Sequence, residues 1–143
     1  MASGIERFEF EGRLFATVVR KTYRSQGPDF LTEPESPLQL GILTHKKNAE
    51  IKAHTHRTVP RTIDKTNEVL YVLEGRVEVI FYSDCGKLHG ETILEKGDTI
   101  LLSDGGHGFR MLEDARILEV KQGPYTGVEN DKTLIAKKGE NGV

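Results

Sequence analysis

The sequence has few of the features that mark secreted, disulfide-bonded or membrane-spanning proteins. Its single cysteine, Cys85, has no second cysteine to pair with inside the chain, and there is no tryptophan. No uninterrupted apolar run approaches the roughly 20 residues that cross a bilayer, and the chain turns polar at Ser3, too early for a signal peptide. We therefore expect a cytoplasmic protein that has no membrane partner.

A strong excess of either charge is also missing. Twenty basic residues against 22 acidic ones leave a formal net charge of -2. A chain so close to neutral has no broad positive field that would attract nucleic acid, so we expect a small-molecule ligand instead. The length of 143 residues suits one domain over residues 1–143 and leaves little room for another.

Glycine, by contrast, is abundant, and its 15 residues separate short runs of valine, isoleucine, leucine, phenylalanine and tyrosine. This pattern is typical of strands joined by turns, and no window of a dozen residues shows a convincing helical period. The sequence predicts an all-β fold, mostly antiparallel, with turns at Gly75 and Gly97. The predicted strands are residues 5–10, 14–20, 38–45, 49–56, 68–73, 77–82, 91–95, 99–102, 108–112 and 115–121.

Three segments do not follow this pattern of short apolar runs separated by turns. Residues 24–37 contain three prolines and are predicted to form a surface loop or a lid. Residues 57–67 form a second loop with basic side chains, which either are simply solvated or bind an anion. Residues 127–143 are polar, and we expect a flexible tail there.

A pair of histidines on one predicted strand is the strongest sign of chemistry. His54 and His56 are two residues apart, so on a strand their imidazoles project from the same face and can converge on one metal ion. Glu68 opens a later apolar run, and His107 begins another strand. A shell of imidazoles and one carboxylate suits Fe(II), Mn(II), Ni(II), Co(II) or Zn(II), and is poor for calcium or magnesium.

These residues resemble the two sequence motifs of the cupin superfamily. The first motif, a glycine, five residues, His-x-His, a gap, a glutamate, six residues and a glycine, is similar to Asn48, His54, His56, Glu68 and Gly75. The second motif resembles Gly97-Asp98 followed by Ser103-Asp104-Gly105-Gly106-His107. The resemblance implies a single-domain jelly-roll β-barrel over about residues 38–122. It also implies one divalent transition metal ion bound by His54, His56, Glu68 and His107.

The chain departs from the family pattern in two instructive places. Asn48 stands where the family has glycine, and asparagine enters left-handed conformations more readily than most residues. Eleven residues separate His56 from Glu68, where the family usually has three or four, which indicates an enlarged loop. The Gly105-Gly106 pair gives the backbone the freedom to bring His107 to the metal.

Strand parity predicts the surroundings of these residues. Glu68 should share its face with Leu70 and Val72, and His107 with Phe109 and Met111, which gives a largely apolar pocket. Lys52 should share the face of the two histidines, where it is either a solvated charge at the rim of the pocket or the one candidate from this set for proton transfer.

The strand that begins at Glu68 is apolar on both faces. Because such a strand is buried on both sides, it implies a covering sheet or a second subunit, and we expect a homodimer.

Three functions are compatible with this sequence. The first is a metal-dependent enzyme, an oxygenase, isomerase or lyase, acting on a small polar metabolite such as a sugar or organic acid derivative by Lewis-acid or dioxygen chemistry. The second is a non-catalytic module that binds or senses a small ligand. The third is a metal-free relative of sugar-nucleotide epimerases or isomerases. The segment 119–125 is similar to the ends of small cupins of bacterial polysaccharide pathways, which favours carbohydrate metabolism.

Overall fold

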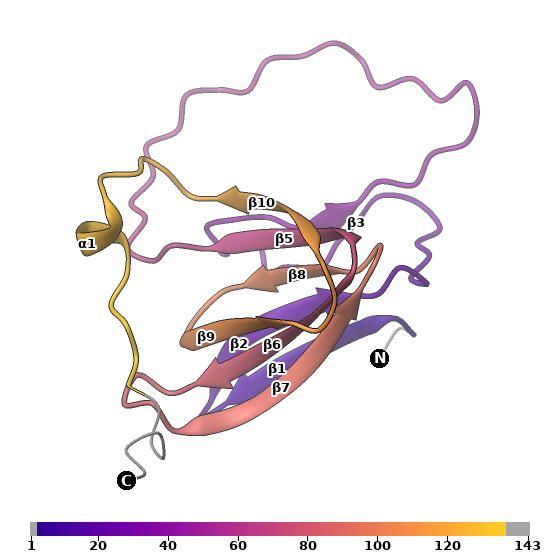
Figure 1. Ribbon diagram of the computed structural model, residues 1–143. Coiled ribbons are helices and arrows are strands. Elements are labelled where there is room, and N and C mark those ends of the chain that lie inside the picture. The colour runs from indigo at the N-terminus through magenta and orange to yellow at the C-terminus, as the bar shows by residue number, and fades with distance from the viewer. Residues whose placement is uncertain (1–2, 137–143) are drawn as a thin grey trace, which may run out of the picture. The chain divides into compact units, whose positions relative to one another are not determined.

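The computed structural model describes residues 3–136, which form two compact units (Figure 1). The sheet unit comprises the described parts of Met1–Tyr23 and Lys65–Val143, and the insert unit comprises Arg24–Asp64. Antiparallel strands dominate the secondary structure. The prediction of an all-β, mostly antiparallel fold is therefore confirmed.

Two sheets build the sheet unit. The first has five strands in the order β1-β2-β8-β5-β10, namely β1 (Ile5–Phe10), β2 (Arg13–Val19), β8 (Thr99–Leu102), β5 (Glu68–Glu74) and β10 (Arg116–Lys121). The second has three strands in the order β7-β6-β9, namely β7 (Leu88–Glu95), β6 (Arg76–Tyr82) and β9 (Gly106–Met111). Every strand predicted for this unit is present, with ends that differ by at most three residues.

The hydrophobic core joins the two sheets. Alternate residues of a strand point to one side, and in each sheet one such set, for example Leu70 and Val72 of β5 or Val79 and Phe81 of β6, is buried in the core. Full burial of each such side chain contributes about 1.5–3 kcal/mol to folding. The core cluster consists of Phe15, Ala16, Val18, Leu70, Val72, Val79, Phe81, Leu94, Ile100 and Leu102.

The connections in this unit follow the predicted turn chemistry. Gly75 and Gly97 have φ values of +83° and +92°, which confirms that both form turns. Within residues 3–136 no ladder of hydrogen bonds joins the two sheets, so closure into a jelly-roll barrel stays a prediction.

The predicted tail is not wholly irregular. It contains a single helical turn, α1 (Val128–Asp131), while residues 137–143 lie outside the part that the structure describes. In the described chain, no helix has the length and apolar character that crossing a membrane requires.

The insert unit differs most from the sequence prediction. It contains one short antiparallel pair, β3 (Asp29–Phe30) with β4 (Gly41–Ile42), so the loop predicted at 24–37 holds a strand. The strand predicted at 38–45 is wrong except for β4, and the strand predicted at 49–56 is wrong throughout. The reason is that Ile51 is the only large apolar residue of 49–56 and is itself exposed, so alternation there gives no face to bury. Asn48 has a φ of +68°, as its place in the motif predicted.

Candidate functional site

Two of the four predicted metal ligands meet in the sheet unit. Glu68 begins β5 and His107 lies near the start of β9, so they come from different sheets. The His107 Nε2 and Glu68 Oε2 atoms are 3.3 Å apart. The side chains are 27% and 12% exposed, respectively. The fold therefore brings together residues that are 39 positions apart in the sequence, at the margin of the core.

The strand register explains why both side chains point inward. Glu68 shares its side of β5 with the core residues Leu70 and Val72, as strand parity predicted. His107 pairs across the ladder with the core residue Phe81, and so lies on the inner side of the three-stranded sheet. The structure thus confirms the predicted faces in the sheet unit.

The electrostatics of the pair favour an ionised carboxylate. A hydrogen bond from His107 lowers the pKa of the Glu68 carboxyl, against the opposing effect of burial, and the nearby positive charge of Lys121 lowers it further. An ionised Glu68 can accept a hydrogen bond from His107 or bind a cation. The pair therefore supplies a carboxylate and an imidazole, the groups that acid–base chemistry or metal binding requires.

The turn that precedes His107 is anchored by one carboxylate. Asp104 accepts hydrogen bonds from Arg13 Nε at 3.0 Å and Nη2 at 2.6 Å, and from Lys65 Nζ at 2.8 Å. It also accepts one from the backbone N–H of Gly105 at 2.8 Å. The Arg13 guanidinium holds the pKa of Asp104 well below its usual range. These contacts fix the backbone three residues before His107.

Glycine is required at the next position of this turn. Gly105 has a φ of +68°, and a Cβ atom there would overlap the ring of Phe15. Both facts exclude a larger residue, because L-residues rarely adopt this conformation and the ring is part of the core. The predicted role of this glycine in bringing His107 to the site agrees with the observed backbone.

A buried amide holds the start of β5 near this turn. Asn67 donates a hydrogen bond from Nδ2 to the carbonyl of Ser103 at 3.0 Å, and its backbone N–H donates to Gln122 Oε1 at 2.9 Å. Asn67 is nearly inaccessible to solvent. The residue before Glu68 and the turn before His107 are thus tied together, which helps to set the distance in the pair. No sequence motif singles out Asn67.

The apolar side chains near His107 are only partly covered. Phe109 and Met111 share the inner side of β9 with it, and the His107 and Phe109 rings lie 5.4 Å apart. Both apolar residues are nevertheless exposed. This combination leaves an apolar surface next to a polar pair, which suits a small ligand with both apolar and polar parts.

The other two predicted ligands lie in the insert unit. His54 and His56 are exposed and do not belong to a strand, so the predicted alternation with Lys52 on a shared strand face is wrong. Their rings are nevertheless close to each other, with centroids 5.2 Å apart and planes at 80°. His54 Nδ1 donates a hydrogen bond to the carbonyl oxygen of Lys52 at 2.8 Å, an arrangement that in the neutral ring puts the lone pair on Nε2.

Each pair fits the donor chemistry of a transition metal ion. Two ligand atoms at right angles, each about 2.1 Å from an ion, are about 3 Å apart, close to the spacing between Glu68 and His107. A ring N–H donated to a backbone carbonyl, as in His54, is the usual support of a metal-binding histidine. Among the side chains of residues 3–136, no group of three or more is gathered into a metal site. The two pairs belong to separate units, and the structure describes each by itself.

Sequence patterns single out neither Lys121, which lies beside Glu68, nor its ion-pair partner Asp131. Lys121 is the register partner of Glu68 across the ladder of β5 and β10, and so points to the same side. Its ammonium group lies 3.2 Å from the carboxylate of Asp131 on α1, which raises the pKa of Lys121. Strand parity could have placed Lys121 only if the pairing of β10 with β5 had been known.

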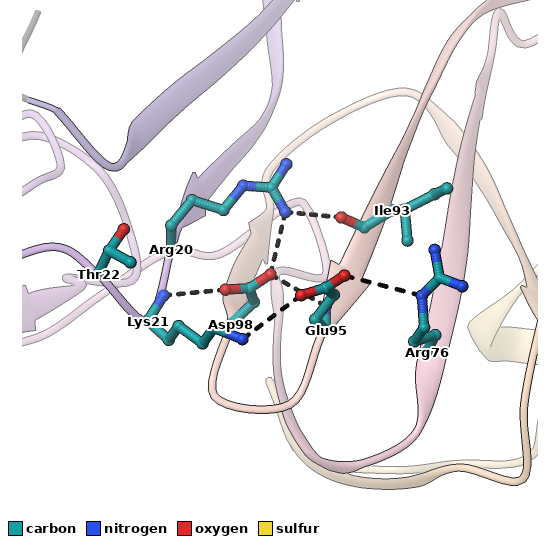
Figure 2. Close-up of a pocket in the computed structure, with 7 residues that line it drawn as sticks. All are labelled: Arg20, Lys21, Thr22, Arg76, Ile93, Glu95 and Asp98. Carbon is teal, nitrogen blue, oxygen red and sulfur yellow. Dashed lines mark hydrogen bonds and ion pairs between the residues drawn. The ribbon is translucent and has the colours of Figure 1, made fainter.

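A second charged cluster at the β7–β8 turn joins the two sheets (Figure 2). The Arg20 guanidinium donates to both carboxylate oxygens of Glu6, at 2.7 and 3.0 Å, and to Asp98 Oδ2 at 3.0 Å. It also donates to the Ile93 carbonyl at 2.6 Å and to the Thr92 hydroxyl at 3.0 Å. All five N–H groups of the guanidinium are thus used within the protein.

The cavity beside this cluster has a volume of about 430 Å³, but its charged groups face one another. Buried Asp98 accepts further hydrogen bonds from the backbone N–H groups of Lys21 and Glu95, and the Glu95 carboxylate lies between the side chains of Lys21 and Arg76 (Figure 2). We interpret the cluster as a structural clasp and not as a ligand site, because the Arg20 guanidinium and the Asp98 carboxylate at its centre already satisfy each other and their neighbours.

Comparison with known proteins gives no match. No model of a known family matches the chain, no curated protein matches its sequence, and no solved structure matches its fold.

Proposed function

We propose that this chain is a cupin-like protein that binds one divalent transition metal ion and acts on a small polar metabolite, a sugar or organic acid derivative. The observation that carries the proposal is the inward-facing Glu68 and His107 pair, 3.3 Å apart, which two different sheets bring together where the second-motif resemblance places a ligand. His54 and His56 would complete the ligand set, and this part of the proposal comes from the sequence motif.

The residues around the pair indicate how a ligand would be held. The ionised Glu68 and the imidazole of His107 are donors for Fe(II), Mn(II), Ni(II), Co(II) or Zn(II). When bound, such an ion supplies a Lewis acid or a site for dioxygen. The exposed apolar surface of Phe109 and Met111 would contact the ligand, and the anchored turn around Asp104 would keep His107 in place.

Metal binding to purified variants tests this proposal. We expect the wild-type chain to bind one equivalent of at least one of these five ions. His107→Ala and His54→Ala should each weaken binding more than tenfold, since each removes a ligand. His45→Ala is the matched control, because it removes an exposed imidazole from the insert unit without touching the proposed set. Unchanged affinity in His107→Ala would exclude the site.

A metal-free function is the second candidate, favoured by the contact between His107 and Glu68. A carboxylate that accepts a hydrogen bond from an imidazole orients the ring and stabilises its protonated form, so His107 could exchange protons with a sugar-derived substrate. Tyr125, which the epimerase mechanism would also need, lies with its ring 5.2 Å from the ammonium group of Lys121. Activity that survives exhaustive chelation but is lost in His107→Ala would favour this candidate over the first.

We also propose that the protein forms a homodimer through the outer side of β10. This strand is an edge of its sheet, and its outward residues Leu118 and Val120 are exposed beside Tyr71 of β5. An apolar edge strand offers both side chains and unpaired backbone groups to a second copy. The proposal explains why the run that begins at Glu68 is apolar on both faces.

A further inference from the structure

Lys121 places a positive charge at the candidate site. It ends β10 opposite Glu68 in the register, on the inner side of the sheet, and its side chain is only 23% exposed. Register partners on neighbouring antiparallel strands point to the same side, so the Lys121 and Glu68 side chains lie next to each other on that side. A cation is therefore built into the surroundings of the Glu68 and His107 pair.

The partner of this cation is supplied by the segment after β10. We name residues 122–136 the C-terminal strap. This segment leaves the end of β10 and passes through α1 (Figure 1). Near its end, Ile135 lies against Gly106, the residue before His107. Asp131 of the strap places its carboxylate 3.2 Å from Lys121 Nζ, and its side chain is only 12% exposed. The Asp131 carboxylate thus already occupies a position next to the Lys121 ammonium group.

None of the residues 122–136 of the strap is fully buried. The helix α1 is only four residues long, and none of its residues is fully buried. A helical turn this short has little stability of its own, so its position depends on the ion pair and on the packing of Ile135. A carboxylate from another molecule could take the place of Asp131 with the strap moving aside.

From these observations we propose that Lys121 anchors the carboxylate group of an organic acid bound beside Glu68 and His107, and that Asp131 occupies this position in the ligand-free protein. The inference rests on the proposed function and names the substrate class of its site. Lys121 offers the ligand carboxylate a positive charge that belongs to the protein itself and adds to that of the proposed metal ion.

Competition between Asp131 and an added dicarboxylate tests the proposal. Malonate is titrated into the wild-type chain, Asp131→Asn and Lys121→Gln, and binding is followed by calorimetry. Because Asp131→Asn removes the internal competitor, we expect it to bind malonate about five- to tenfold more tightly than the wild type. Lys121→Gln should lose at least tenfold, and the double variant should show no gain over Lys121→Gln. Equal affinity of Asp131→Asn and the wild type, or full binding by Lys121→Gln, would overturn the proposal.

Two controls exclude trivial explanations. Lys132→Gln removes another ammonium group near Asp131, at 3.9 Å but 55% exposed, and should leave malonate affinity unchanged. Asp131→Glu keeps the competing charge and should bind malonate as the wild type does, which separates competition from damage to the strap. Tighter binding of inorganic phosphate than of malonate by Asp131→Asn would contradict the assignment to carboxylates.

The metal content of the same variants separates this inference from the proposed function. Lys121→Gln should bind the metal ion with wild-type stoichiometry, because Lys121 is not one of the four proposed ligands. A metal-free wild-type chain whose malonate affinity still depends on Lys121 would refute the metal function and keep the anion site. A chain that binds metal normally but shows no dependence on Lys121 would refute the anion site alone.

Discussion

Replacing Asp104 by asparagine tests how the site is anchored. The substitution keeps the shape of the side chain and removes its charge, so it weakens the hydrogen bonds from Arg13 and Lys65 without creating a cavity. A hydrogen bond to a charged group contributes about 1.5–3 kcal/mol when shielded and less when water competes. Since the Asp104 side chain is only 16% exposed but both cations are partly solvated, we expect a loss of about 2 kcal/mol in the free energy of unfolding.

Urea unfolding at several pH values measures this loss. For a slope of about 2 kcal/mol per molar urea, the midpoint should fall by about 1 M at pH 7. The folded-state pKa of Asp104 is lowered, so its stabilising effect is complete above the unfolded-state pKa of about 3.9 and is lost as the pH falls through the folded-state value. The difference between wild type and Asp104→Asn should therefore shrink below about pH 4.

The refuting result is a difference in midpoint that stays constant from pH 7 to pH 2.5, because the effect would then not come from the charge of Asp104. Asp84→Asn is the matched control. Asp84 faces the same guanidinium, with its carboxylate 3.6 Å from Arg13 Nη1, but its side chain is 79% exposed. We expect the control to change the midpoint by less than a quarter as much as Asp104→Asn.

Three further predictions concern the turn, the pair and the edge strand. Gly105→Ala should destabilise the protein by about 3–5 kcal/mol in urea unfolding, because strain and overlap add. The control Gly12→Ala has a φ of +72° but open space around the new methyl group, so it should lower the free energy of unfolding by only about 1–2 kcal/mol. Equal losses in the two variants would contradict the overlap between a Cβ atom at Gly105 and the Phe15 ring. His107→Ala should raise the pKa of Glu68 toward its ordinary value, because the hydrogen bond from the imidazole is the main cause of the lowered pKa. Carboxyl-carbon NMR of the metal-free protein measures this pKa, and an unchanged value would contradict the contact. Leu118→Asp should convert a dimer into a monomer in sedimentation velocity, whereas a monomeric wild type would rule out the proposed interface.

The strands of the sheet unit could be predicted from the sequence because each combines an apolar inner face with a turn at its end. Parity within one strand was equally reliable, and it placed Glu68 beside Leu70 and Val72. The insert unit could not be predicted in this way. Its alternating residues 49–56 are mostly polar, so the pattern had the period of a strand without the apolar surface that stabilises one.

The candidate site was only partly accessible to sequence reasoning. The contact between His107 and Glu68 agrees with the motif resemblance, which rests on the residue types and on the spacing from Glu68 to Gly75, although the loop before Glu68 is longer than in the family pattern. Lys121 and Asp131 were missed because their importance depends on which strands pair and on where the chain returns after β10. Local sequence patterns do not encode such long-range pairing.

The origin of Glu68 and His107 in separate sheets gives their contact a further meaning. The two strands that carry them are not joined by a ladder, so the packing of the core residues between the sheets sets how far apart these side chains stand. The distance between Glu68 and His107 therefore depends on the spacing between the two sheets. A core substitution on a strand that carries neither residue, such as Leu94→Val on β7, removes one methylene group from the core and would thereby change the ionisation of Glu68. A substitution that changes the packing of the core, and with it the stability of the protein, is therefore expected to change the pKa of Glu68 as well.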